Sequence, residues 1–388
     1  MKRVLYIDIP FTGINDGGAN RSKFIWKTLV SQYDVDWLEL EREGIPSGTE
    51  NPTGINNHFK LKVKIDRRMF MPIMIFCLPK SSRQQLHNIF RKNKYDLVFI
   101  RFLSPARLSK IIKKYCPTIV FDIDMLLSRL SMLSWKRKPQ FNNRYYFLES
   151  IKQDKYEKSF FKNPYLFLFT NSEERESVLQ KMKLSDPNHI KVLPNVMEKK
   201  ELCSLPKKQR IIFFGTLTSA ANADALKYLD EELYELMEKR LEETGIYLDV
   251  VGRGWHNHFD QIFNGKNRLR YIGEVADIQE EISSSLAVFL PLRIASGTRT
   301  RILEAANQAV PVITTPIGAE GLDLKEEILI RSNSIDLVDG LFLVLKDKTL
   351  RQKLGQSLQI KSRQLYGEEN VRTLLINLLE NYWENRNA

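Results

Sequence analysis

Residues 291–322 read PLRIASGTRTRILEAANQAVPVITTPIGAEGL and place a short helical pattern between two buried-strand patterns. The strand-like run LAVFLPL ends at Leu292, a polar turn with Gly297 follows, and the β-branched run PVITT begins at Pro311. Ile302, Leu303 and Ala306 form the apolar face of the helix between them. In a parallel sheet this order places the helix start beyond the carboxyl ends of the strands, where ligands bind.

Arg299 and Arg301 stand at the start of this helix, where the macrodipole favours anions and each arginine costs a few tenths of a kcal/mol. That cost is consistent with a bound anion of about two charges, because guanidinium groups match phosphate oxygens. Glu304 follows, and its carboxylate can accept two hydrogen bonds from a ribose diol. The sequence therefore predicts a phosphate site here; the alternative is a surface helix with stray charges.

Buried strand patterns alternate with helical patterns twice along the chain, before and after the connector IKVLPNVMEKKELCSLPKKQ. Two such sets predict an α/β protein with two Rossmann-like, doubly wound parallel-sheet domains that face a cleft. We expect these domains at residues 1–198 and 199–365, with a last helix at 366–388 that crosses back to the first domain. The strand runs are RVLYIDI, YDLVFIRF, PTIVFDID and YLFLFTNS, then RIIFFGTL, YLDVVGRG, RLRYIGEV, LAVFLPL and PVITT.

The composition is that of a globular protein: 388 residues, 43% hydrophobic and 27% charged. Cys77, Cys116 and Cys203 form no CxxC pair, so neither a disulfide framework nor a zinc site is indicated. The start MKRVLYIDIP is too quickly polar for a secretion signal, and the longest apolar run, Met69 to Leu78, contains Pro72 and is too short for a membrane span. We expect a cytoplasmic protein.

The net charge of +12 is concentrated in the first half of the chain. Residues 51–150 hold 20 basic and 5 acidic side chains, and apolar residues lie among basic ones at 67–80 and 125–138. These two segments predict peripheral contact with an anionic membrane at the inner face of the cytoplasmic membrane; the alternative is that their apolar residues pack in the core. Because the basic residues follow no reader motif, we expect no nucleic-acid partner.

The segment 291–322 resembles the donor-domain signature of retaining GT-B glycosyltransferases, the glycosyl transferases group 1 family. In that family a Glu-x7-Glu motif holds a nucleotide-sugar. Glu304 matches the second glutamate, which contacts the ribose hydroxyls, whereas Ser296 stands where the first glutamate contacts the donor sugar. The backbone N–H groups of Gly297 and Thr298 would then take over that contact.

The resemblance extends to other parts of the chain. INDGGANRS resembles the family's glycine loop, which implies that Gly17 and Gly18 close over the diphosphate. The element FFGTL lacks the family's usual Arg and Lys, which moves the phosphate charge to Arg293, Arg299 or Arg301, with Arg299 and Arg301 preferred. The base would be lined by Gly252, Gly254 and the backbone from Gly273 to Val275.

Asp122 and Asp124 end a buried strand in an Asp-x-Asp pattern. In the GT-B interpretation Asp124, and after it Asp122, contacts the acceptor or its attacking hydroxyl, with Arg299 as the third catalytic candidate. The alternatives are a cap for the next helix and a divalent cation site like that of GT-A enzymes. GRG at 252–254 lacks the rest of a dinucleotide fingerprint, and HNH at 256–258 lacks further ligands, so no cofactor or metal is expected.

The resemblance implies a metal-independent hexosyltransferase that uses a nucleotide-diphosphate sugar. UDP is the expected nucleotide, and the expected acceptor is a glycan or lipid-linked glycan of envelope or exopolysaccharide synthesis. The same resemblance implies transfer with retention. Two alternatives stay open: a GT-B nucleotide-sugar epimerase, and a non-catalytic protein that binds carbohydrate or membrane.

Overall fold

The computed structural model describes residues 1–9, 17–42, 53–65, 72, 74–137, 144–183, 187–203, 207–254, 260–294 and 299–387. The chain divides into two compact units. Unit 1 comprises Met1–Val196 and Val371–Ala388, and unit 2 comprises Met197–Asn370. The sequence placed these divisions after residues 198 and 365.

Unit 1 contains a sheet of strand order β4-β3-β2-β1-β5-β6-β7-β8, parallel except for the β3–β4 pair. The order reverses between β1 and β5, which is the position where doubly wound sheets bind ligands. Its strands are β1 Arg3–Asp8, β2 Asp34–Arg42, β3 His58–Ile65, β4 Phe76–Cys77, β5 Leu97–Arg101, β6 Ile119–Ile123, β7 Leu166–Phe169 and β8 Ile190–Val192.

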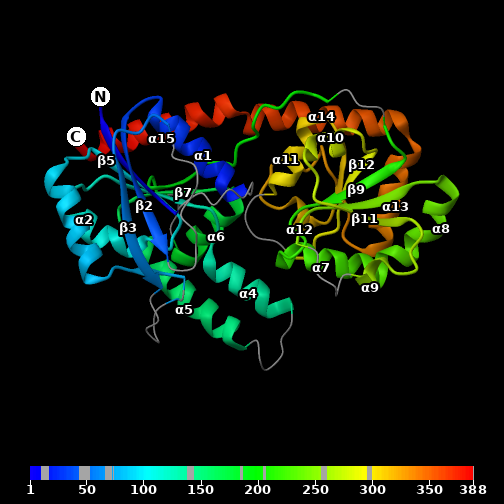
Figure 1. Ribbon diagram of the computed structural model, residues 1–388, viewed down its shortest axis with the longest axis horizontal. Coiled ribbons are helices and arrows are strands. Elements are labelled where there is room, and N and C mark those ends of the chain that lie inside the picture. Colours follow the sequence, from blue (N-terminus) through cyan, green and yellow to red (C-terminus); the bar gives the residue numbers. More distant parts are fainter. Residues whose placement is uncertain are drawn as a thin grey trace. The chain divides into compact units, whose positions relative to one another are not determined.

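Two apolar clusters form the core of unit 1, and residues of the same strands contribute to both. Val371, Leu375 and Leu379 of α15 belong to one of them, so the last helix is part of this unit, near α1 in Figure 1. Its helices are α1 Gly17–Val30, α2 Lys80–Lys92, α3 Ser109–Ile112, α4 Leu127–Arg137, α5 Arg144–Phe160, α6 Ser172–Met182 and α15 Glu368–Asn387.

Unit 2 contains a fully parallel sheet of order β11-β10-β9-β12-β13-β14, which reverses between β9 and β12. Its strands are β9 Arg210–Phe214, β10 Tyr247–Val251, β11 Leu269–Gly273, β12 Ala287–Leu290, β13 Val312–Thr314 and β14 Leu329–Ile330. Its helices are α7 Ala220–Tyr228, α8 Tyr234–Thr244, α9 Asp260–Phe263, α10 Ile278–Ser283, α11 Thr300–Asn307, α12 Pro316–Ala319, α13 Ser334–Lys346 and α14 Lys348–Tyr366.

These sheets confirm the predicted pair of doubly wound α/β domains. The central strands are short, apolar and buried along nearly their whole length, as parallel strands covered on both faces require. The sequence did not reveal β2, because its run DVDWLELER carries four acidic residues. Asp36 of this strand is buried and accepts hydrogen bonds from Arg3, Asn57 and Tyr95 at 2.7–2.8 Å.

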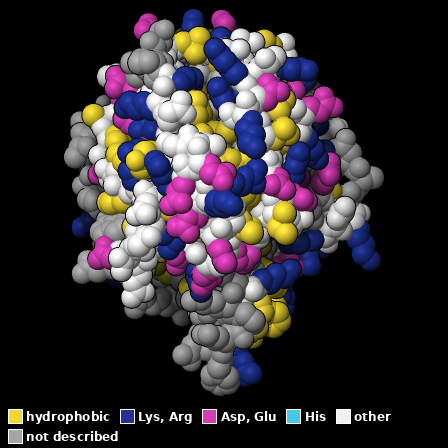
Figure 2. Space-filling model, turned by 90° about the vertical axis from the view of Figure 1, so that its right-hand side faces the viewer, with side chains coloured by type: hydrophobic (Ala, Val, Ile, Leu, Met, Phe, Trp, Pro, Cys, Tyr) yellow, Lys and Arg dark blue, Asp and Glu magenta, His cyan; other side chains and the backbone are white. Residues whose placement is uncertain are grey.

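The two segments expected at a membrane are partly core. Ile75, Phe76 and Leu126 are buried in an apolar cluster of unit 1, so the expectation of membrane contact is wrong for these side chains. Residues 67–71 and 73, and residue 138, lie outside the described residues. No helix within the described ranges is both long and apolar enough to cross a bilayer. On the face shown in Figure 2, basic and acidic side chains are mixed.

Candidate functional site

The candidate site of unit 2 lies where its parallel strands end, which we call the carboxyl edge of the sheet. Strands β9 and β12 are neighbours there, and the order of the sheet reverses between them. Gly215 follows β9, Gly252 follows β10, and Arg293 comes shortly after β12. The loops of this edge therefore surround the position at which an α/β sheet binds a ligand.

Gly252 and Gly254 keep these loops close together. The N–H of Gly252 donates to the carbonyl of Gly273 at 2.8 Å, and that of Gly215 donates to the carbonyl of Val251 at 3.0 Å. A Cβ on Gly252 would collide with the carbonyl of Gly215, and Gly254 has a φ of 87°. Only glycine fits this packing, so the packing alone explains why glycine stands at these positions. The predicted contact of these residues with a base stays a prediction.

Val275 was predicted to line the base together with Gly273. The Val275 side chain is partly buried against the apolar core of unit 2, and the predicted contact of its backbone with the base stays a prediction. Ser296, Gly297 and Thr298 lie outside the described residues. The described part of the site continues at Arg299, the N-cap of α11, which makes no side-chain cap hydrogen bond.

Arg301 points from the first turn of α11 to the end of β9. Its Nη1 donates to the carbonyl of Phe214 at 2.9 Å and lies beside Gly215. Within the described part of the chain, this is the one hydrogen bond of the guanidinium, and no carboxylate pairs with it. Burial lowers the pKa of Arg301 to about 10, although the nearby carboxylate of Glu304 opposes the shift. The group stays charged at neutral pH, and no carboxylate among the described residues forms an ion pair with it.

The other two arginines already have partners. Arg299 is buried, donates to the carbonyl of Ile317 at 3.0 and 3.2 Å, and lies 3.6 Å from Glu320. Arg293 donates to both carboxylate oxygens of Asp224 at 3.2 Å, and its guanidinium lies 4.4 Å from the centre of the Tyr228 ring. Of the three predicted phosphate ligands, Arg301 therefore has the most hydrogen-bonding capacity left.

Glu304 lies one turn after Arg301 and is half-buried. Burial raises its pKa to about 7; Lys200 and Arg301 lower it, and Glu198 raises it further. The described residues supply no hydrogen bond or ion pair to its carboxylate. Such a group destabilises the fold when ionised, and it has both oxygens available to accept hydrogen bonds from a ligand.

Asp122 and Asp124 lie at the carboxyl edge of unit 1. Asp122 is fully buried, and Arg21 donates to its two oxygens at 2.9 and 2.5 Å while Arg101 binds one of them. Although burial opposes ionisation, Arg21 and Arg101 hold the pKa of Asp122 below its usual range. Its carboxylate thus has no free face for an acceptor, and we assign it a structural role instead of the predicted catalytic one.

Asp124 is more accessible than Asp122. Its side chain is 14% exposed, and Arg101 donates to both of its oxygens at 3.0 Å. Arg21 and Arg101 thus form ion pairs with the carboxylates of the Asp-x-Asp pattern. The described residues contain no group of three or more His, Cys, Asp or Glu arranged to hold a metal ion. The HNH motif lies outside the described residues.

The sequence reasoning missed Arg101 and Asp8. Asp8 is buried at the end of β1, accepts from the Tyr6 hydroxyl at 2.6 Å, and has its pKa raised to about 6 by burial against the opposing effect of Arg101. Arg101 also donates to the carbonyl of Gly18 in the first turn of α1 at 3.3 Å. Asp8 ends β1, Arg101 ends β5 and Asp122 lies near the end of β6. Charged residues at the ends of neighbouring buried strands were the signal that could have revealed this cluster. Gly17 begins α1, and its role over a diphosphate stays a prediction.

Residues 208–347 match the family model described as glycosyl transferases group 1. A search of curated proteins finds no match to the sequence.

Solved structures match along nearly the whole chain. HepE of Anabaena, in complex with UDP and glucose, is 13% identical with a TM-score of 0.63, over 98% of this chain and 100% of that chain. A glycosyltransferase from Rickettsia africae is 13% identical with a TM-score of 0.66, over 99% of both chains. A mutant of S. aureus TarM, in complex with fondaparinux, α-GlcNAc-glycerol and UDP, is 9% identical with a TM-score of 0.66, over 98% and 100%. The chain therefore has the GT-B fold, and its residues 208–347 are similar to the glycosyl transferases group 1 family.

Proposed function

We propose that this protein transfers a hexosyl unit from a UDP-sugar, such as UDP-glucose, to a glycan or lipid-linked acceptor in envelope or exopolysaccharide synthesis. The observation that carries the proposal is the Arg301 guanidinium at the reversal point of the unit 2 sheet, which is charged and has no ion-pair partner in the described part of the chain. HepE and TarM, which share the fold, are each described in complex with UDP.

In this proposal the diphosphate lies at the start of α11. Arg301 donates its remaining N–H groups to the phosphate oxygens, and the first-turn N–H groups of the helix add to this. When the glycosidic bond to the diphosphate breaks, negative charge grows on the leaving group. Fixed positive charge at Arg301 lowers the energy of that transition state without a metal ion. This ligand would also pair with the Arg301 guanidinium, to which the described residues supply no ion pair.

Glu304 binds the nucleoside in this proposal. Its two carboxylate oxygens accept hydrogen bonds from the ribose hydroxyls, which requires the ionised form. Asp124 contacts the acceptor, and the bidentate hydrogen bonds from Arg101 fix the orientation of its carboxylate. We propose that the transferred sugar retains its anomeric configuration, as the family resemblance implies.

We further propose that unit 1 contacts an anionic leaflet through the first turn of α5. Tyr145, Tyr146, Phe147 and Leu148 are 40–60% exposed there, and the Trp135 ring of α4 lies 5.8 Å from that of Phe147. Exposed Lys136 and Arg144 flank these side chains. Aromatic rings beside cationic groups suit the interface between headgroups and acyl chains. We propose this surface for the membrane contact in place of the buried side chains of segments 67–80 and 125–138.

Replacing Arg301 with Gln tests the phosphate site. We expect UDP binding to weaken about 10- to 100-fold, because charge-assisted hydrogen bonds are each worth roughly 1.5–3 kcal/mol. Thermal shifts with UDP, GDP, ADP and CDP, followed by calorimetry, give the affinities, and donor turnover by the parent separates an enzyme from a binder. Lys227→Gln, an exposed change on α7, should leave UDP affinity unchanged. UDP binding to the Arg301→Gln variant at parental strength would refute the site.

Glu304→Gln tests the nucleoside contact through stability. The folded-state pKa of about 7 exceeds the ordinary value of 4.5, so the parent loses stability as pH rises between these values. We expect the variant to be more stable than the parent by about 1–3 kcal/mol at pH 8, with a smaller gain at pH 5, in urea unfolding. It should also lose the preference for UDP over 2′-deoxy-UDP. Exposed Glu235→Gln is the matched control; a destabilised Glu304→Gln variant at pH 8 contradicts the assignment.

The membrane contact is measured by sedimentation with vesicles of phosphatidylglycerol and phosphatidylcholine. We expect Tyr146→Ser combined with Phe147→Ser to reduce vesicle binding about tenfold, because two partly exposed rings no longer enter the interface. Leu236→Ser combined with Ile335→Ser removes exposed apolar side chains from unit 2 and should have no effect. Equal losses in the two double variants, or no binding by the parent at low salt, would contradict the contact.

A further inference from the structure

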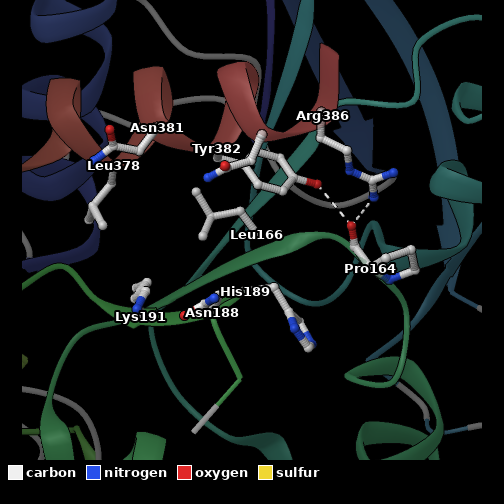
Figure 3. Close-up of a pocket in the computed structure, with 10 residues that line it drawn as sticks. Pro164, Leu166, Asn188, His189, Lys191, Leu378, Asn381, Tyr382 and Arg386 are labelled. Carbon is white, nitrogen blue, oxygen red and sulfur yellow. Dashed lines mark hydrogen bonds between the residues drawn. The ribbon is translucent and has the colours of Figure 1, made fainter. Parts of the chain in front are cut away.

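A cavity of about 660 Å³ lies in unit 1 between α15, the start of β7 and the residues before β8 (Figure 3). Leu166 begins β7 and Pro164 lies just before it, and Asn188 and His189 come directly before β8. The cavity therefore opens at the amino ends of the parallel strands. Asp122 and Asp124 lie at the opposite edge of the same sheet, so this cavity is separate from the acceptor site proposed above.

One face of α15 forms the second wall of the cavity. Leu378, Asn381, Tyr382, Asn385 and Arg386 recur at intervals of three and four residues, which places them on one side of the helix. The Tyr382 hydroxyl donates to the carbonyl of Pro164 at 2.9 Å, and Arg386 donates to the same carbonyl, as Figure 3 shows. These bonds join the helix to the start of β7, so the wall is formed before any ligand binds.

The charge of this cavity is positive. Lys191 and Arg386 line it, and no carboxylate is among its lining residues. Glu380 of the same helix pairs with Lys2 and accepts a hydrogen bond from Tyr33 at 2.6 Å instead. In the described part of the chain Lys191 has no hydrogen-bond or ion-pair partner. An anionic group beside Lys191 would therefore be bound by a charge-assisted hydrogen bond, while Arg386 adds positive charge at the other end of the cavity (Figure 3).

The remaining lining groups match a sugar. Asn188, Asn381 and Asn385 each offer an amide donor and acceptor, and their side chains make no hydrogen bond within the described residues. Leu166, Leu378 and the Tyr382 ring supply apolar surface between them. A few convergent polar groups on an apolar floor are typical of small-molecule sites of this volume. Amides recognise vicinal hydroxyls, and the apolar floor accommodates the C–H face of a pyranose.

We propose that this cavity binds an anionic saccharide, a sugar unit that carries a phosphate or a carboxylate. Lys191 binds the anion, Arg386 adds positive charge at the other end of the cavity, and the three asparagines bind the hydroxyls. The site is distinct from the carboxyl edges of both sheets and does not depend on the transferase proposal. If the acceptor is a polymer with repeated anionic sugars, this cavity would bind one sugar unit while a different unit of the same polymer reacts.

Calorimetric titration of the full chain with glucose 6-phosphate, glucuronate and glucose tests this site. We expect saturable binding of at least one of the two anions, at least tenfold tighter than glucose and unaffected by saturating UDP. The phosphate and carboxylate probes show which anion the site prefers. No saturable binding of either anion, equal affinity for glucose, or displacement by UDP would overturn the proposal.

Variants locate the binding in the cavity. Lys191→Gln and Asn381→Leu should each weaken binding of the preferred anion at least tenfold, while UDP affinity stays at the parental value. Lys110→Gln, an exposed lysine of unit 1 outside the cavity, is the matched control and should bind as the parent does. An unchanged affinity in both cavity variants, or an equal loss in the control, would overturn the assignment. Unaltered UDP binding in the same samples shows that the variants are folded.

Discussion

A partly buried guanidinium that forms no ion pair with any described carboxylate is the constraint on which the unit 2 site depends. The strands of this sheet are mostly apolar, and Asp249, a charge buried within β10, is paired with Arg210 and Arg270. The site lies at the edge where the strands end. Arg301 sits at that edge, near the reversal between β9 and β12, and donates to the backbone carbonyl of Phe214. Burial of such a charge is unfavourable until a partner arrives. An anionic ligand resolves this imbalance, and the proposed pyrophosphate is such a ligand.

The corresponding edge of unit 1 shows the opposite balance. Arg21 and Arg101 face Asp122 and Asp124, and each aspartate receives hydrogen bonds or ion pairs from these arginines. The charges there compensate one another inside the protein, which leaves only the partly exposed Asp124 available to a ligand. At this edge, unit 1 therefore has arginines and aspartates that are paired with one another, whereas unit 2 has Arg301 without a described ion-pair partner. This difference supports binding of the negatively charged donor by unit 2.

The sequence predicted the parts that follow from local pattern. The central strands could be read from their apolar runs, and the helix with Arg299, Arg301 and Glu304 from its place between two of them. Strand β2 could not be predicted, because Asp36 and Glu39 are buried by partners distant in sequence. The pairing of Asp122 could not be predicted for the same reason, because Arg21 and Arg101 come from other elements. The cavity under α15 depends on residues about 200 positions apart, which no local pattern connects.

A crystal structure of the protein with bound UDP measures the central claim most directly. The account predicts that a phosphate oxygen lies within about 2.7–3.2 Å of the Arg301 guanidinium, with the ribose hydroxyls on the Glu304 carboxylate. A nucleotide bound elsewhere, with Arg301 still bonded to the Phe214 carbonyl alone, would contradict it.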